Sequence, residues 1–144
     1  MARSVLLAGG IAWLVAGLSI LGAAAFAADR LLQLLPPLTI DADALRGAAT
    51  AMAIGVLLVG LAHVSVLLAM RAGRRGADSA GVLLAACLTA LLVAISAAAA
   101  TSAVATPERA VAFIIGALAA GIGAVAYGFA AALLIGELRS GSAT

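Results

Sequence analysis

One basic side chain, His63, lies inside the long apolar runs of this 144-residue sequence, and no arginine or carboxylate does; the runs are residues 4–28, 47–70, 79–106 and 110–136. Ionisable residues are rare inside membrane segments and are candidate functional sites for that reason. An imidazole there can hydrogen-bond to neighbouring helices, bind haem or chlorin as an axial ligand, contact a quinone or relay protons. His63 is therefore the candidate cofactor-binding residue, and the sequence names no cofactor.

Three other distinctive side chains fall at a similar depth. His63 precedes Arg71 by eight residues, which places it about 12 Å below that end of its run at 1.5 Å per residue. The same reasoning places the other three side chains at about 13 to 15 Å. The sequence therefore predicts one intramembrane layer formed by Trp13, His63, Cys87 and Tyr127.

Several reaction classes have no support in the sequence. Transport driven by protons or sodium ions needs a carboxylate deep in the membrane, and none of the apolar runs contains one. The chain has one histidine, one cysteine and no HExxH, CxxC or phosphate-binding glycine motif. The prediction is a protein without catalytic residues, without a metal site and without enzymatic activity.

The elements that carry these residues are predicted to be transmembrane helices. Hydrophobic residues make up 66% of the chain, charged residues 10%, and the mean hydropathy is +1.28. A run of about 20 apolar residues crosses a hydrocarbon core of roughly 30 Å, and only a helix satisfies its own backbone there. We expect an all-α protein with four helices in an up-down bundle, which form a single transmembrane domain over 1–144. The predicted spans are residues 4–28, 47–70, 79–104 and 108–137, and residues 29–46 form the predicted outer loop. The first run exceeds the 7–15 residues of a signal-peptide core, so we expect it to be retained.

The arginines predict the orientation. Five lie on one side of the predicted spans and three on the other; the five are Arg3, Arg71, Arg74, Arg75 and Arg139, and the three are Arg30, Arg46 and Arg109. The positive-inside rule then places both termini in the cytoplasm. We expect the cluster of Arg71, Arg74 and Arg75 to lie among anionic lipid headgroups. No basic stripe with interleaved aromatics predicts nucleic-acid binding.

Helix boundaries and packing can also be predicted. Thr106 and Pro107 are typical of an N-cap and first helical residue, and Asp43 and Asp78 could cap the second and third helices. Small residues mark close helix contacts in lipid, which predicts packing positions at Gly55, Gly60, Gly116, Gly121 and Gly128. Matches between 4–28 and 79–104, and between 47–70 and 108–137, are consistent with two tandem helical hairpins.

The predicted function is that of a non-catalytic accessory or scaffolding subunit of a membrane protein complex. Its predicted partners are the lipid bilayer and other membrane subunits or further copies of itself. One alternative is a small homo-oligomeric pore or carrier. A second alternative is a subunit of an electron-transfer complex, with His63 as haem, chlorin or quinone contact.

Overall fold

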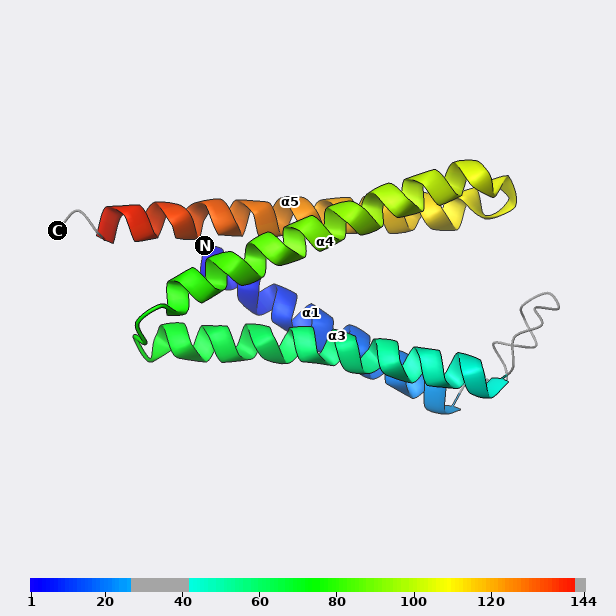
Figure 1. The fold of residues 1–144 in the computed structure, drawn as a ribbon, viewed down its shortest axis with the longest axis horizontal. Helices are drawn as coiled ribbons and strands as arrows, with labels where there is room; N and C mark the ends of the chain where they lie inside the picture. The colour runs from blue at the N-terminus through cyan, green and yellow to red at the C-terminus, as the bar shows by residue number, and fades with distance from the viewer. Residues whose placement is uncertain (27–41, 142–144) are drawn as a thin grey trace. The chain divides into compact units, whose positions relative to one another are not determined.

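The computed structural model describes residues 1–26 and 42–141, and all of the regular structure within these ranges is helical. Figure 1 shows the elements in chain order, and their bounds are α1 Ala2–Phe26, α3 Ala42–Arg71, α4 Ala77–Ala105, the 3₁₀ helix η1 Pro107–Arg109, and α5 Ala110–Gly141. The predicted all-α class with four long helices is confirmed.

Each of the four long helices contains a segment apolar enough to cross a membrane, and these segments are Ala2–Phe26, Arg46–Arg71, Ala77–Ala105 and Pro107–Ser140. Their lengths of 25 to 34 residues correspond to about 38 to 51 Å of helix, which exceeds a hydrocarbon core of roughly 30 Å. The chain is therefore a multi-pass membrane protein. Residues 27–28 of the first predicted span and 29–41 of the predicted outer loop, including Arg30, lie outside the described residues.

The start of α3 differs from the predicted boundary. The helix begins at Ala42, so residues 42–46 are helical although they belong to the predicted loop. Asp43 lies in its first turn, where a carboxylate faces the positive end of the helix dipole, and Arg46 Nη1 lies 3.3 Å from Asp43 Oδ1. The expectation that Asp43 caps the helix is wrong, because it lies inside it. The charged residues mark the start of the apolar run at residue 47, but the helix already begins at Ala42.

The described contacts divide into two compact units. The α1–α3 unit comprises Leu7–Ser65, and the α4–α5 unit comprises Met1–Leu6 with Val66–Thr144. Both α1 and α3 thus contribute residues to each unit. The single domain expected from the sequence stays a prediction.

In the α1–α3 unit, the two helices run antiparallel and interlock through glycines. A Cβ built on Gly10 approaches His63 Cβ at 2.9 Å, one on Gly60 approaches Leu14 at 2.7 Å, and one on Gly17 approaches Leu57 at 2.7 Å. These positions advance by three or four residues along each helix, which is the spacing of a knobs-into-holes seam. Each glycine leaves the space that a larger side chain of the other helix fills.

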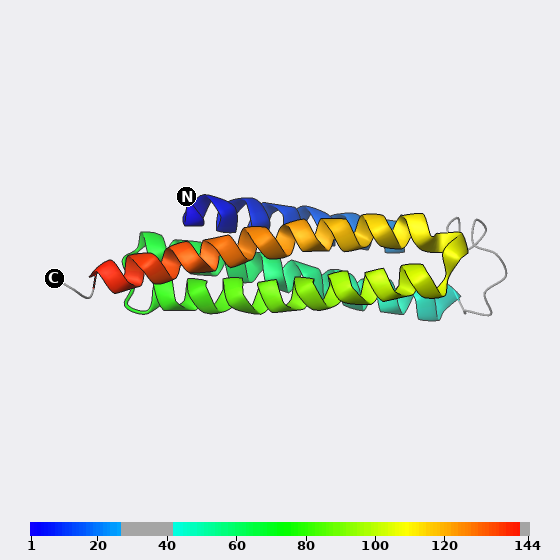
Figure 2. The same ribbon diagram turned by 90° about the horizontal axis from the view of Figure 1, so that it is seen from above.

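In the α4–α5 unit, the two helices are also antiparallel and lie side by side (Figure 2). Ser96 Oγ donates a hydrogen bond of 2.8 Å to the carbonyl oxygen of Ala117. Further along the same pair, the Cβ position of Gly123 lies 3.0 Å from Leu92. The buried residues of α5 recur at roughly one helical turn and are Ala120, Ala124, Tyr127, Ala130, Ala131 and Leu134.

Two glycines form the turn between α3 and α4. Gly73 has φ 62° and Gly76 has φ 82°, in the left-handed region that glycine adopts without steric cost. Gly73 N–H donates to Met70 O, and Arg74 N–H donates to Ala69 O, which is the Schellman pattern of a helix C-terminus. Gly76 is the N-cap of α4, so the prediction that Asp78 caps this helix is wrong.

At the other end of α4, Thr106 and Pro107 begin the next element, as expected from the sequence. That element is η1, a single 3₁₀ turn that leads into α5. The Thr106 hydroxyl makes no cap bond to η1 and instead donates to Ser102 O at 2.8 Å. Thr106 therefore satisfies the last turn of α4 rather than the first turn of the next helix.

Candidate functional site: the helix seam around His63

His63 is the one buried polar or charged side chain among the described residues, and its exposed fraction is 0%. It belongs to the α1–α3 unit, where Gly10 of α1 leaves room for it. A Cβ on Gly10 would lie 2.9 Å from His63 Cβ and 3.5 Å from Cγ. The imidazole is thus part of a close helix crossing and does not face lipid.

A hydrogen bond to the backbone of its own helix holds the His63 ring. His63 Nδ1 lies 2.8 Å from the carbonyl oxygen of Val59, one helical turn earlier. A carbonyl only accepts, so Nδ1 donates this hydrogen bond. Burial of a polar group without a hydrogen bond costs free energy, and this bond offsets part of that cost.

The other members of the predicted layer are distributed over both units. In the α1–α3 unit, Trp13 follows Gly10 by three residues, which places it about 4.5 Å further along α1 than the level of His63. In the α4–α5 unit, Tyr127 is buried with 5% exposed, whereas Cys87 is exposed. Cys87 and Tyr127 therefore do not point to a common interior, and a layer of all four residues stays a prediction.

The predicted packing glycines have different surroundings. A Cβ on Gly60 would clash with Leu14, while one on Gly121 or Gly128 would make only ordinary contacts, at 3.6 Å to Ser96 and 3.7 Å to Thr89. Added Cβ atoms on Gly55 and Gly116 would meet no atom within 4 Å.

The tight positions that the sequence reading missed are Gly10, Gly17, Gly81 and Gly123. The predicted packing positions follow from small residues four apart on one helix. In the α1–α3 seam, however, each small residue faces a large one on the other helix. The seven-residue spacing of Gly10 and Gly17 is the signal that could have identified them.

Positive charge gathers at one end of the α4–α5 unit. Arg71, the last residue of α3, is exposed, and so are Arg74 and Arg75 in the turn that follows it. Arg3 Nη2 lies 3.8 Å from Asp78 Oδ1, which places the start of α1 at the same end. The Cβ position of Gly81 lies 3.3 Å from Leu134, so the last turns of α5, which carry Arg139, also reach this end.

The acidic and metal-binding side chains form no cluster in the described ranges. No group of three or more His, Cys, Asp or Glu side chains in residues 1–26 and 42–141 could hold a metal ion.

The sequence matches no protein-family model and no curated protein, and the fold matches no solved structure.

Proposed function

We propose that this chain is a non-catalytic integral membrane subunit that scaffolds or stabilises a larger membrane protein complex. The observation that carries the proposal is the setting of His63. The only basic side chain within the apolar runs is fully buried, lies against Gly10 and donates to Val59 O. This setting is that of a packing residue, because the ring takes part in the α1–α3 seam.

The described helices expose apolar faces that other molecules could contact. On α5, for example, Val111, Ile122 and Val125 are each more than 70% exposed. The described connections between helices are short, namely residues 72–76 and the segment around η1. Contacts with other subunits would therefore form mainly inside the bilayer, through van der Waals packing of such faces.

The orientation proposed with this function places both termini in the cytoplasm. Its support is the gathering of Arg3, Arg139 and the cluster of Arg71, Arg74 and Arg75 at one end of the α4–α5 unit. Cytoplasmic ends of membrane helices carry an excess of arginine and lysine. The exposed arginine cluster would interact with anionic headgroups of the cytoplasmic leaflet.

One observation favours a second candidate, a subunit of an electron-transfer complex. Metal-ligating histidines commonly donate one ring N–H to a backbone carbonyl, which fixes the orientation of the ring. The bond from Nδ1 to Val59 O matches that arrangement. Ligation of haem through Nε2 would require α1 and α3 to separate, since the ring is fully buried.

Purification in a mild detergent from native membranes would test the proposal. The proposed function predicts that one or more different chains co-purify at fixed stoichiometry, and that the preparation lacks a pigment band. A homo-oligomer that conducts ions or solutes after reconstitution into liposomes would contradict it and favour a pore or carrier. A Soret band that co-purifies with the chain would favour the electron-transfer subunit.

A further inference from the structure

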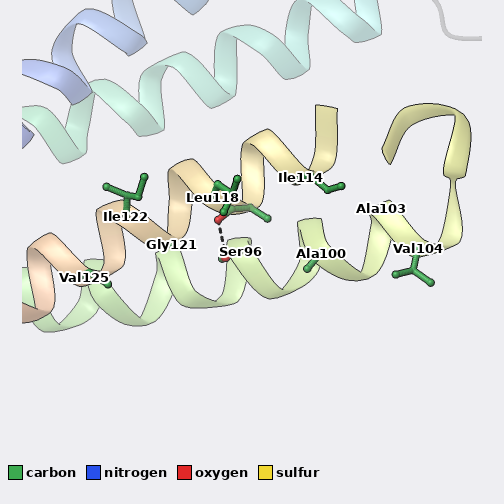
Figure 3. Close-up of a pocket in the computed structure, with 10 residues that line it drawn as sticks. Ser96, Ala100, Ala103, Val104, Ile114, Leu118, Gly121, Ile122 and Val125 are labelled. Atoms are coloured by element: carbon green, nitrogen blue, oxygen red, sulfur yellow. Dashed lines mark hydrogen bonds between the residues drawn. The ribbon is translucent and has the colours of Figure 1, made fainter. Parts of the chain in front are cut away.

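The two ends of the α4–α5 unit differ in their polar groups. Toward η1, the side chains between α4 and α5 are apolar except for Ser96, whose hydroxyl already donates to Ala117 O (Figure 3). At the other end, the arginine cluster of Arg71, Arg74 and Arg75 places three exposed guanidiniums within five residues of sequence. The concentrated charge of this unit therefore lies where α3 ends and α4 begins.

The arginine cluster has no acidic partner among the described residues. Two other arginines do have one, since Arg46 lies 3.3 Å from Asp43 and Arg3 lies 3.8 Å from Asp78. Asp78 is the acidic residue closest to the cluster in the sequence, and its Oδ1, the oxygen near Arg3, is buried. All three positive charges of the cluster are thus available to a ligand.

The backbone holds the cluster close together. Arg74 N–H donates to Ala69 O, and Ala77 N–H donates to Arg74 O, so hydrogen bonds tie the turn to α3 and to the start of α4. The first and last α-carbons of the cluster are four residues apart, which is at most about 15 Å at 3.8 Å per residue. The three guanidiniums can therefore reach phosphate groups of one molecule.

The composition of the cluster favours phosphate as the ligand. A guanidinium presents paired N–H donors that match two phosphate oxygens, and the chain contains no lysine. A headgroup with one negative charge would pair with one guanidinium and leave two like charges that repel each other. A headgroup with two phosphates would pair with at least two guanidiniums. Basic sites at the ends of membrane helices bind headgroups of this kind.

We propose that the arginine cluster binds a membrane lipid that carries two phosphates in one headgroup, as cardiolipin does. A lipid is the source of the phosphates because the cluster lies at the ends of two membrane-crossing helices, at the level of the headgroups. This proposal deepens the headgroup contact named under the proposed function and rests on it for the leaflet. The site itself belongs to one unit of the chain and requires no other subunit.

Two variants and a matched control allow the proposal to be tested. Arg74→Gln combined with Arg75→Gln removes two of the three guanidiniums, and Arg75→Gln alone is the smaller change. Both side chains are exposed, so the variants should keep the helical content of the wild type, which circular dichroism measures. Arg109→Gln is the control, because Arg109 is exposed at the opposite end of the same unit.

The measurement is native mass spectrometry of the full chain in a neutral detergent, with equal amounts of phosphate supplied as cardiolipin and as phosphatidylglycerol. The wild type and Arg109→Gln should retain cardiolipin in preference. The double variant should bind it at least about tenfold more weakly, because hydrogen bonds to charged groups are lost, and Arg75→Gln should lie between the two. Micelles leave both ends of the chain accessible, so this result does not depend on the topology or on partner subunits.

Three results would overturn the proposal. The first is equal retention of the two lipids by the wild type, and the second is an equal loss of cardiolipin in Arg109→Gln and in the double variant. The third is displacement of cardiolipin by an excess of inorganic phosphate, because the ligand would then be a free phosphate rather than a lipid.

Discussion

A Cβ atom on Gly10 would lie 2.9 Å from the Cβ of His63, so the buried imidazole and the missing side chain form a complementary pair across α1 and α3. Real Cβ atoms essentially never approach so closely, and the neighbouring contact is a Cβ close to the α3 backbone rather than a flexible side-chain end. The position of His63 and the proximity of the two helices therefore depend on each other.

This pairing predicts that Gly10→Ala destabilises the protein. The added methyl group must push α1 away from His63, and overpacking of this kind costs about 1–3 kcal/mol. Gly22→Ala is the control on the same helix, because a Cβ there meets nothing within 4 Å. It should be neutral or stabilising by up to about 1 kcal/mol, as alanine favours helix. Reversible unfolding in detergent micelles would measure both, and equal stability of the two variants would argue against a tight seam.

The Ser96 hydroxyl should contribute measurably to the α4–α5 hairpin. Its hydrogen bond to Ala117 O joins two helices, and interhelical bonds of this type in membranes average about 0.6 kcal/mol. We expect Ser96→Ala to lower the free energy of unfolding by about that amount. Ser65→Ala should change it less, because Ser65 donates to Leu61 O within its own helix. A larger loss for Ser65→Ala in the same unfolding assay would be inconsistent with this assignment.

Labelling of single cysteines would establish the orientation. With Cys87→Ser as the background, Ser140→Cys reports on the arginine-rich end of the α4–α5 unit and Glu108→Cys on the opposite end. Both positions are exposed. An impermeant maleimide added to intact cells should label position 108 and not position 140. Labelling of position 140 alone would reverse the proposed topology.

Local sequence determines the helices well but determines their contacts poorly. The apolar runs give four spans whose bounds lie within a few residues of the structure, because burial in a membrane requires long uncharged helices. The start of α3 and the cap of α4 were missed, since charged residues can continue a helix and a left-handed glycine can begin one. These features depend on turn geometry rather than on hydropathy.

The same contrast holds at the candidate site, where the sequence identifies the important side chain but not its contacts. His63 is the notable side chain in the sequence, and its burial fits its chemistry, because a polar imidazole directed into lipid without a partner would cost free energy. Its partner Gly10 could not be predicted, because the contact depends on how α1 and α3 are aligned. Cys87 was placed correctly on a helix, but its outward direction depends on the rotation of α4, which hydropathy alone leaves open.

The most direct test of the structural role assigned to His63 compares the wild type with His63→Gln by absorbance, unfolding and co-purification of partner chains. A glutamine amide can still donate to Val59 O, so we expect a loss of stability below about 1 kcal/mol, unchanged partners and no pigment band in either protein. A Soret band in the wild type that disappears in His63→Gln would show that His63 is a haem ligand and would contradict the account.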